Sequence, residues 1–175
     1  NETEASVTKP IEGVSERILS CATEEFLEKG YSDASLRTIA AKAGTTTGSI
    51  YSRFKDKEGL FAAIVGPVAE YMMNLFVKTQ EEFHAVEPER QPKEMDDYVI
   101  SGMDEMLDYI YDNFTAFQLL LEASYGTKFQ NFVEQLAEVE AEYTYKFMEV
   151  IHFQNDEENE VTGEFIHIMT RALFD

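Results

Sequence analysis

A run of small polar residues from Thr45 to Ser49 has the side chains suited to contacting the edges of DNA bases. The run reads Thr-Thr-Thr-Gly-Ser, and Tyr51, Ser52 and Arg53 follow almost at once. The major groove of B-DNA is about 12 Å wide, so a helix that enters it needs short polar side chains near its start. Hydroxyl and guanidinium groups one turn later can reach phosphate oxygens. The spacing therefore predicts a DNA-contact surface if a helix presents it.

The charge of the chain is unevenly distributed along the sequence. The formal net charge is −20, which taken alone argues against a nucleic-acid partner. From Ser35 to Lys57, however, five residues are basic and only Asp56 is acidic, whereas from residue 63 to the end six are basic and 24 acidic. The basic residues of this island are Arg37, Lys42, Arg53, Lys55 and Lys57. The sequence thus places a small cationic segment on the polar run and an acidic remainder behind it.

The segments around the polar run have the pattern of three helices. Apolar residues at a period near 3.6 predict a helix over 14–29, which we expect Gly30 to stop. A short alanine-rich helix over 36–43, capped by Ser35, is followed by Gly44 in a tight turn and by a third helix over 47–54. Two short helices joined by a glycine turn are the components of a helix-turn-helix.

The rest of the chain is also predicted to be helical. A long helix begins at Asp56 and runs to about residue 83, with a kink rather than a break expected at Pro67. A linker over 85–93 leads to helices over 94–111, 114–123, 128–152 and 161–174. The core candidates of the helix over 94–111 are Tyr98, Val99, Met103, Met106, Leu107 and Ile110. The fold class is therefore all-α, with an N-terminal helix-turn-helix head and a C-terminal helical bundle as its body.

Several other classes of protein are disfavoured by the sequence. The three histidines, His84, His152 and His167, are isolated, and no catalytic or metal-ligand spacing connects to them, so we expect no enzyme, cofactor or metal site. Cys21 is the only cysteine, which suits a reducing cytoplasm and a small core residue. The sequence contains no run of eighteen apolar residues, so we expect no membrane span.

The first 64 residues contain motifs that together resemble those of one known family. The stretch from Leu36 to Phe61 has Ala-Gly before the turn, Gly-Ser-Ile-Tyr in the third helix, the aromatic Phe54, and Lys-Asp-Lys-Glu-Gly-Leu-Phe at the start of the fourth. This combination resembles the N-terminal domain of TetR-type (TetR/AcrR) transcriptional regulators over about residues 15–64. Beyond Phe83 the resemblance is architectural only.

The resemblance implies roles for individual positions in the head. Arg37 would reach a phosphate or base edge, Tyr51 would place its hydroxyl on a phosphate, and Lys57 would pair with a phosphate at a helix N-terminus. The expected DNA-binding residues are Arg37, Thr46, Thr47, Gly48, Ser49, Tyr51, Ser52, Arg53 and Lys57. Ser52 and Arg53 depart from the bulky aromatic and histidine often found there in the family, which bears on base preference.

Each of these positions also has a plainer interpretation. Thr45 to Ser49 could form an ordinary capped turn, and Lys55 and Lys57 could be a solvated surface pair. Tyr51 could be purely a core residue, and Arg53 could simply pair with an acidic neighbour.

The resemblance also implies functions for the body. It predicts a homodimer through the helices around 128–152 and 161–174, which binds a palindromic double-stranded DNA operator and is released by a small-molecule effector. The fourth helix would couple the two sites. The aromatic and methionine content of the body suits a flat, apolar or cationic effector. The candidate pocket residues are Tyr98, Met103, Met106, Phe117, Glu122 and Tyr125.

These inferences divide the chain into a disordered arm over 1–12, a DNA-binding domain over 13–60 and an effector-binding and dimerisation domain over 61–175. The function expected is that of a cytoplasmic bacterial repressor, and the sequence leaves an activator open. The alternative from another class is an acidic helical protein-interaction module that has lost DNA binding, and the net charge motivates it.

Overall fold

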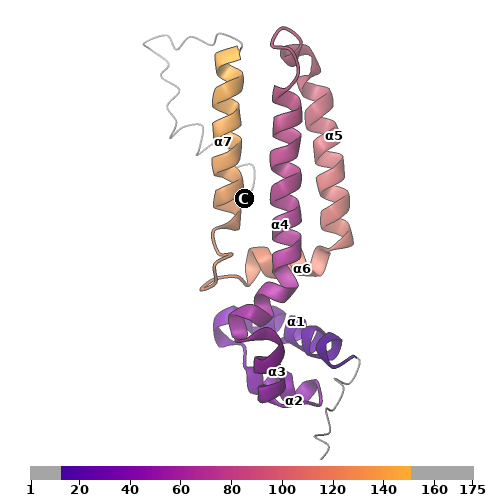
Figure 1. Ribbon diagram of the computed structural model, residues 1–175, viewed down its shortest axis with the longest axis vertical. Coiled ribbons are helices and arrows are strands. Elements are labelled where there is room, and N and C mark those ends of the chain that lie inside the picture. Colours follow the sequence, from indigo (N-terminus) through magenta and orange to yellow (C-terminus); the bar gives the residue numbers. More distant parts are fainter. Residues whose placement is uncertain (1–12, 151–175) are drawn as a thin grey trace, which may run out of the picture.

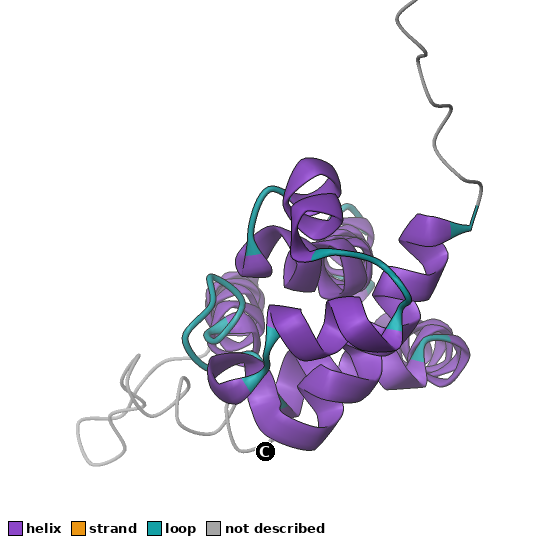
Figure 2. Cartoon of the chain, turned by 90° about the horizontal axis from the view of Figure 1, so that it is seen from below, coloured by secondary structure: helices purple, strands orange, loops and turns teal. Residues whose placement is uncertain are grey.

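A computed structural model describes residues 13–150 of the 175-residue chain, and all the regular structure of this range is helical. Figure 1 shows a small head at one end and a long helical body above it, and Figure 2 shows the molecule from the head end. The expected arm over 1–12 and the expected helix over 161–174 lie outside the described residues. The seven helices are α1 (Val14–Asp33), α2 (Leu36–Lys42), α3 (Thr47–Phe54), α4 (Lys57–His84), α5 (Gln91–Asp112), α6 (Phe114–Glu122) and α7 (Phe132–Val150). The all-α head and body are thus confirmed for these residues.

The head consists of α1, α2, α3 and the first turns of α4 around one apolar core. Phe26, Ile39, Ile50 and Phe61 are fully buried in it, one from each of these helices. The three helix starts expected from the sequence are confirmed to within a residue. Gly30 adopts φ 72° inside α1, as a helix-ending glycine does, but one further turn follows it to Asp33. The same cluster continues into the body through Phe117 and Phe132, and α2 and α3 lie on the outer side of the head (Figure 1).

Helix α4 is the axis that joins head and body. It continues through Pro67 without a break, and Pro67 itself is exposed. Among the described residues it is the one helix long and apolar enough to cross a membrane by length and composition. Its apolar side chains are instead engaged in packing, since Leu60, Phe61, Val65, Val68, Ala69, Met72, Leu75, Phe76 and Phe83 are all buried.

The body places α5 and α7 along α4, with α6 crossing below them beside the head (Figure 1). Helix α5 begins at Gln91, inside the segment expected to be a linker, because Pro92 is well suited to the first helical turn. Helix α7 begins at Phe132, four residues later than expected, since residues 124–131 form a turn-rich loop. These shifts leave the expected order of elements unchanged.

Part of the core predicted on helix α5 is exposed in the structure. Val99, Met103 and Leu107 were expected in the core, but they are about half exposed. The helix instead faces α4 through a narrower strip that includes Gly102, where an added Cβ would lie 2.7 Å from the Thr79 side chain. Because this close approach fixes the rotation of α5, an apolar stripe is turned outward: Met95, Val99, Ile100, Met103, Leu107 and Tyr111.

Candidate nucleic-acid interface

The turn between α2 and α3 is built by two side-chain caps and one glycine. The Ser35 hydroxyl accepts a hydrogen bond from the Thr38 amide, and the Thr46 hydroxyl accepts one from the Ser49 amide at 3.2 Å. Gly44 has φ 64°, and the next amide, that of Thr45, donates to the Ala40 carbonyl. Polar caps at both helix starts and a left-handed glycine between them hold α3 at a defined angle to α2.

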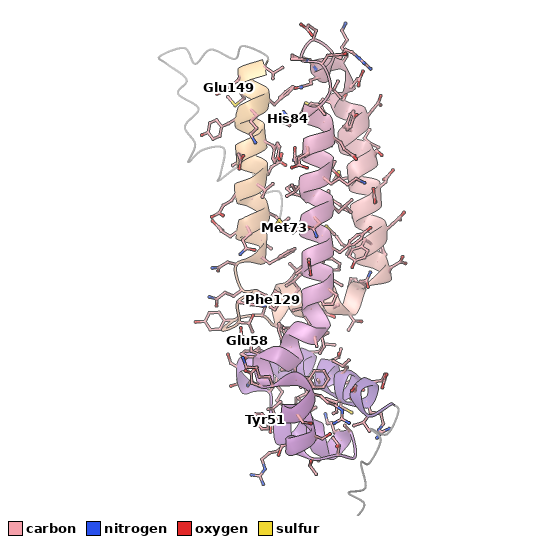
Figure 3. The ribbon with its side chains drawn as sticks, viewed as in Figure 1. Tyr51, Glu58, Met73, His84, Phe129 and Glu149 are labelled. Atoms are coloured by element: carbon pink, nitrogen blue, oxygen red, sulfur yellow. The ribbon has the colours of Figure 1, made fainter. Side chains whose placement is uncertain are left out.

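Helix α3 presents nearly all of its surface outward. Ile50 is its only buried residue, and Phe54 is half-buried against the head core. Thr46, Gly48, Tyr51 and Ser52 are exposed, while Thr47, Ser49 and Arg53 are partly exposed. Tyr51 is 54% exposed and lies at the end of the molecule away from the body (Figure 3). The interpretation of Tyr51 as a core residue is therefore wrong.

The two arginines expected at the interface are held differently. Arg37 is exposed on α2 and forms no ion pair with any other residue that the structure describes. Arg53 folds back along α3, and its Nη1 donates to the Ser49 hydroxyl at 2.7 Å and to the Ser49 carbonyl at 3.3 Å. Arg53 forms no ion pair with an acidic residue in the part of the chain that the structure describes, which contradicts the alternative that it pairs with an acidic neighbour. Both hydrogen bonds use the Nη1 atom alone among the donor nitrogens of the Arg53 guanidinium.

Lys57 makes contacts within the head that the resemblance does not imply. Its ammonium donates to the carbonyls of Ser32 at 2.9 Å and Ala34 at 3.0 Å, and it lies 4.8 Å from the centroid of the Tyr31 ring. These contacts tie the start of α4 to the end of α1, where unpaired helix carbonyls attract a cation. In this structure Lys57 is therefore a brace inside the head, with two of its three donors engaged.

The junction between α3 and α4 is a tight turn. Lys55 has φ 72° and ψ −51°, and the Asp56 amide donates to the Phe54 carbonyl at 2.9 Å across it. This is a three-residue γ-turn of the strained, positive-φ kind. The Asp56 carboxylate then caps α4 by accepting from the Gly59 amide at 2.6 Å. A Cβ on Gly59 would lie 1.9 Å from the Phe54 carbonyl oxygen, so only glycine fits there.

Two charged residues of α1 that sequence reasoning missed support the interface. Glu25 is 1% exposed; its Oε1 accepts from the Ser35 amide at 3.2 Å, and its Oε2 lies 3.5 Å from the Lys42 ammonium. Arg17 donates from Nε to the Ala43 carbonyl at 3.3 Å. Glu25 thus holds both ends of α2. The only signal for it in the sequence is an acidic residue within the apolar stripe of the first helix.

The charges separate along the molecule as the sequence suggested. The polar and basic side chains of α2 and α3 lie at the head end, and Glu149 lies near the opposite end of α7 (Figure 3). Helix α5 alone carries seven acidic residues and one basic residue. The acidic body is therefore placed away from the surface that would face DNA phosphates.

The six candidate effector residues are not brought together. Tyr98 packs on Phe83 near the far end of the body, and Phe117 is buried beside Tyr109. Met106 is partly buried against the core. Met103 and Tyr125 are 57% and 81% exposed, and the exposed Glu122 accepts a hydrogen bond from Gln118.

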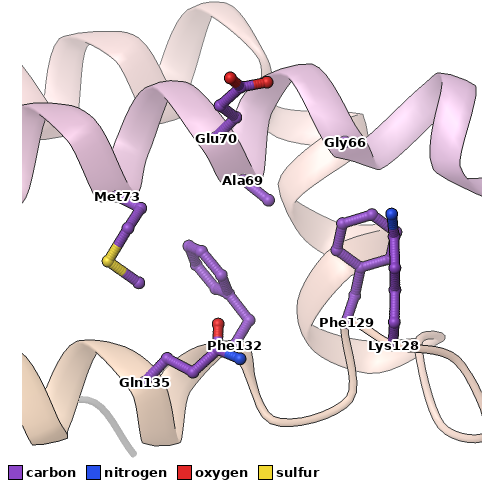
Figure 4. Close-up of a pocket in the computed structure, with 8 residues that line it drawn as sticks. All are labelled: Gly66, Ala69, Glu70, Met73, Lys128, Phe129, Phe132 and Gln135. Carbon is purple, nitrogen blue, oxygen red and sulfur yellow. The ribbon is translucent and has the colours of Figure 1, made fainter.

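A cleft of about 420 Å³ opens elsewhere, between α4 and the segment that leads into α7. Figure 4 shows Phe129, Phe132 and Met73 reaching into the space between these two segments. The cleft includes none of the six candidates, and it is lined by Gly66, Ala69, Glu70, Met73, Lys128, Phe129, Phe132 and Gln135. Its size lies within the range of small-molecule sites. Sequence periodicity alone could not separate Phe129 and Phe132 from ordinary core residues.

The capped turn and the outward face of α3 together form a helix-turn-helix head. A model of the family described as bacterial regulatory proteins, tetR family, matches residues 18–64. The repressor BepR of Brucella suis is 45% identical over 51 residues, which is 29% of this chain and 24% of BepR. The regulator AcrR of Shigella flexneri is 47% identical over 49 residues, 28% of this chain and 23% of AcrR.

Solved structures extend the comparison from the head to the body. A transcriptional regulator of the TetR/AcrR family from Aquifex aeolicus aligns over 93% of this chain and 98% of its own, with a TM-score of 0.50 and 20% identity, which shows a shared fold. Residues 18–64 of the chain thus match the N-terminal domain of the TetR family of bacterial regulatory proteins. The matched segment spans about a quarter of the length of the curated relatives.

Proposed function

We propose that the protein is an effector-responsive transcriptional repressor that binds a palindromic DNA operator as a homodimer. The observation that carries the proposal is the α3 surface, on which the hydroxyls and the glycine of residues 46–52 face outward while Ile50 alone is buried. Named relatives that match this segment include a repressor, BepR. The DNA-binding role is assigned to Arg37, Thr46, Thr47, Gly48, Ser49, Tyr51, Ser52 and Arg53, and Lys57 contributes by bracing the head.

The small DNA-contact area of a single head supports dimerisation. One head buries too little DNA surface for specificity, and a two-fold pair reads two half-sites. We assign the dimer contact to the helices around 128–152 and 161–174, of which the second lies outside the described residues. A DNA operator as partner supports a cytoplasmic location for the protein. The chain divides at about residue 60, where α4 leaves the head, into a DNA-binding domain and an effector-binding and dimerisation domain.

We assign the effector to the cleft between α4 and α7 rather than to the six residues expected from the sequence. Phe129, Phe132 and Met73 offer apolar faces to a flat ring system, and Gly66 and Ala69 leave room for it. Glu70, Lys128 and Gln135 supply polar groups at the same cleft. This composition suits a small molecule with a largely apolar body and a few polar substituents.

The alternative of an acidic interaction module is not favoured, because the capped helix-turn-helix is intact and matches DNA-binding regulators. The deciding experiment is selection of bound sequences from random duplex DNA at two salt concentrations. A palindromic site should be enriched, and Arg37→Ala should weaken binding to all sequences and flatten the salt dependence by about one unit of slope. Arg90→Ala, on the far loop, serves as the control for charge alone. If no sequence is enriched at either salt concentration, the repressor proposal is wrong.

A further inference from the structure

Helix α5 holds a large share of the exposed apolar side chains of the protein. Among residues 13–150, thirteen large apolar side chains are exposed; six of them lie on α5, and only Tyr145 lies on α7. Five of the six recur at every fourth position and are between 40% and 75% exposed: Met95, Val99, Met103, Leu107 and Tyr111. Side chains four residues apart form a ridge of the kind that packs into the groove of a second helix. This apolar row extends about 24 Å along α5, the length of about sixteen helical residues.

The opposite side of α5 is already packed, so the apolar row cannot turn inward. The rings of Tyr98 and Phe83 meet edge to face with centroids 5.6 Å apart, and the ring of Tyr109 stacks on that of Tyr71 at 4.0 Å. Between these two contacts, the buried Gly102 lies directly against α4. Three successive contacts fix the rotation of α5 about its own axis, and the apolar row therefore remains exposed to solvent.

A row of carboxylates runs beside the apolar row. It starts one residue later with the same spacing: positions 96, 104, 108 and 112 are aspartates, and position 100 is isoleucine. All five are exposed, and the four aspartates of this acidic row form no ion pair with any residue that the structure describes. The whole helix has one basic residue against seven acidic ones, a net charge of −6. An apolar ridge with negative charge along one edge is complementary to an amphipathic helix that carries lysine or arginine.

The same charge argues against other occupants of this face. A second copy of α5 would bring a further net charge of −6 to the contact, and like charges placed together oppose binding. Residues 151–175 contain six acidic residues and one basic residue, and residues 1–12 contain three and one, so neither segment supplies the cations. Nucleic acid and an anionic lipid surface would be repelled in the same way. The occupant that fits is a helix of a different, cationic polypeptide.

We propose that the α5 face formed by the apolar row and the acidic row docks a cationic amphipathic helix of another protein. The apolar side chains of the partner pack between Met95 and Tyr111, and its lysines or arginines lie along the four aspartates. In Figure 1 α4 lies between α5 and α7, so this face remains accessible in a dimer formed through α7. The proposal adds a protein partner to the proposed function and does not depend on DNA binding.

The test uses a synthetic peptide as its probe, because the partner is unidentified. The peptide has about eighteen residues, with leucine at every fourth position, lysine directly after each leucine, and alanine and glutamine elsewhere. One control peptide has the same residues in shuffled order, and a second has glutamate in place of each lysine. Fluorescence anisotropy with the full chain should show binding of the lysine peptide alone. Equal binding of either control peptide would overturn the proposal, because the pattern or the charge would then be irrelevant.

Asp104→Asn combined with Asp108→Asn tests the acidic row. We expect affinity for the lysine peptide to fall about tenfold and its salt dependence to weaken, since two of four charges are removed with little change of shape. Glu138→Gln combined with Glu149→Gln is the matched control, because both carboxylates are exposed on α7 and the change in net charge is the same. Equal losses in the two double variants would show that overall charge, rather than this face, attracts the peptide, and the proposal would be wrong.

Met103→Ser combined with Leu107→Ser tests the apolar row. Both side chains are about half exposed, so the variant should keep the helix content of the wild type by circular dichroism while peptide affinity falls about tenfold. Leu27→Ser combined with Tyr145→Ser removes two exposed apolar side chains from α1 and α7 and should bind as the wild type does. Unchanged affinity of the α5 variant contradicts the proposal. Sedimentation gives a second check: if the α5 variant has half the mass of the wild type, a second copy covers the face and the proposal is overturned.

Discussion

The guanidinium of Arg53 donates to the hydroxyl of Ser49 one turn earlier on α3, across 2.7 Å. Both residues belong to the surface assigned to DNA, so free α3 holds its only basic side chain against its own backbone. A cation placed this way can exchange a hydroxyl and a carbonyl for a phosphate or a guanine edge, both of which are stronger partners. A DNA contact made by the same Nη1 atom would replace this hydrogen bond.

Arg53→Ala is expected to weaken operator binding by about 1–3 kcal/mol. The free energy of unfolding should change by less than about 0.5 kcal/mol, because the side chain is partly exposed. Fluorescence anisotropy with the selected operator and urea unfolding measure the two quantities. Lys29→Ala, a basic residue on α1 away from α3, is the control. Equal operator affinity of Arg53→Ala and wild type would remove Arg53 from the interface.

Lys57→Met tests whether Lys57 stabilises the head or contacts a DNA phosphate. The substitution keeps the length of the side chain but removes the ammonium that donates to Ser32 and Ala34. We expect the free energy of unfolding to fall by about 1 kcal/mol and operator affinity to fall with it. The slope of affinity against salt concentration should stay as in the wild type, whereas Arg37→Ala should flatten it. A salt slope reduced as much as that of Arg37→Ala would instead make Lys57 a direct phosphate contact.

Gly59→Ala should be among the most damaging single changes in the head. The added Cβ would lie 1.9 Å from the Phe54 carbonyl oxygen, which is backbone and cannot move without opening the turn before α4. We expect a loss of about 3 kcal/mol or more in the free energy of unfolding. Gly48→Ala is the matched control, because its Cβ meets Thr46 Oγ1 at an ordinary 3.6 Å and alanine favours the helix. Thermal unfolding of the two variants side by side checks the contrast.

Lys55→Gly should stabilise the protein. Lys55 sits at φ 72° in the γ-turn, a conformation that strains every residue with a Cβ. Glycine relieves this strain, and we expect a gain of about 1 kcal/mol in the free energy of unfolding after the added entropy of the unfolded chain is subtracted. Lys29→Gly, in the regular part of α1, should instead destabilise. A loss of stability in Lys55→Gly would show that the lysine is not strained there.

Glu140 is expected to make the folding stability of the protein depend on pH. Burial raises the pKa of this α7 carboxyl, although hydrogen bonds from Gln80 and Thr144 act in the opposite direction. The folded state then binds a proton more tightly than the unfolded chain, so between the ordinary glutamate pKa and the raised value stability falls as pH rises. Glu140→Gln should therefore raise the melting temperature at neutral pH, and the gain should shrink as pH is lowered from the raised pKa toward the ordinary value of about 4.3.

Melts at low protein concentration across this pH range measure the effect. Glu142→Gln, which is exposed and pairs with Lys146 at 2.6 Å, should give no such gain at neutral pH. If Glu140→Gln melts below the wild type at neutral pH, the ionised carboxylate with its two hydrogen bonds is the stabilising form.

Much of the head could be predicted from the sequence because its signals are local. Ser35, Gly44 and Thr46 each have a residue type that only a cap or a tight turn requires, and the structure uses them in that way. Lys57 could not be placed by such reasoning. Its partners are carbonyls of residues 23 and 25 positions earlier, and a carbonyl acceptor leaves no trace in the residue type.

The body was less predictable because its helices are apolar on more than one side. Met103 and Leu107 fit a helical stripe as well as Met106 does, and periodicity cannot tell which stripe faces inward. The close contact between Gly102 and Thr79 decides the rotation, and that contact depends on a residue without a side chain. The cleft depends likewise on the path of the 124–131 loop, which brings Phe129 opposite Gly66.

The outward apolar stripe of α5 has a consequence for the colloidal behaviour of the protein. At neutral pH a net charge of −20 keeps the molecules apart by mutual repulsion, and six exposed apolar side chains on one helix are tolerated. Near the isoelectric point of about 4.4 that repulsion vanishes, and concentrated salt screens it at any pH. Acidification and high ionic strength should then both drive the stripes together, and precipitation in either condition marks the loss of long-range charge repulsion rather than unfolding.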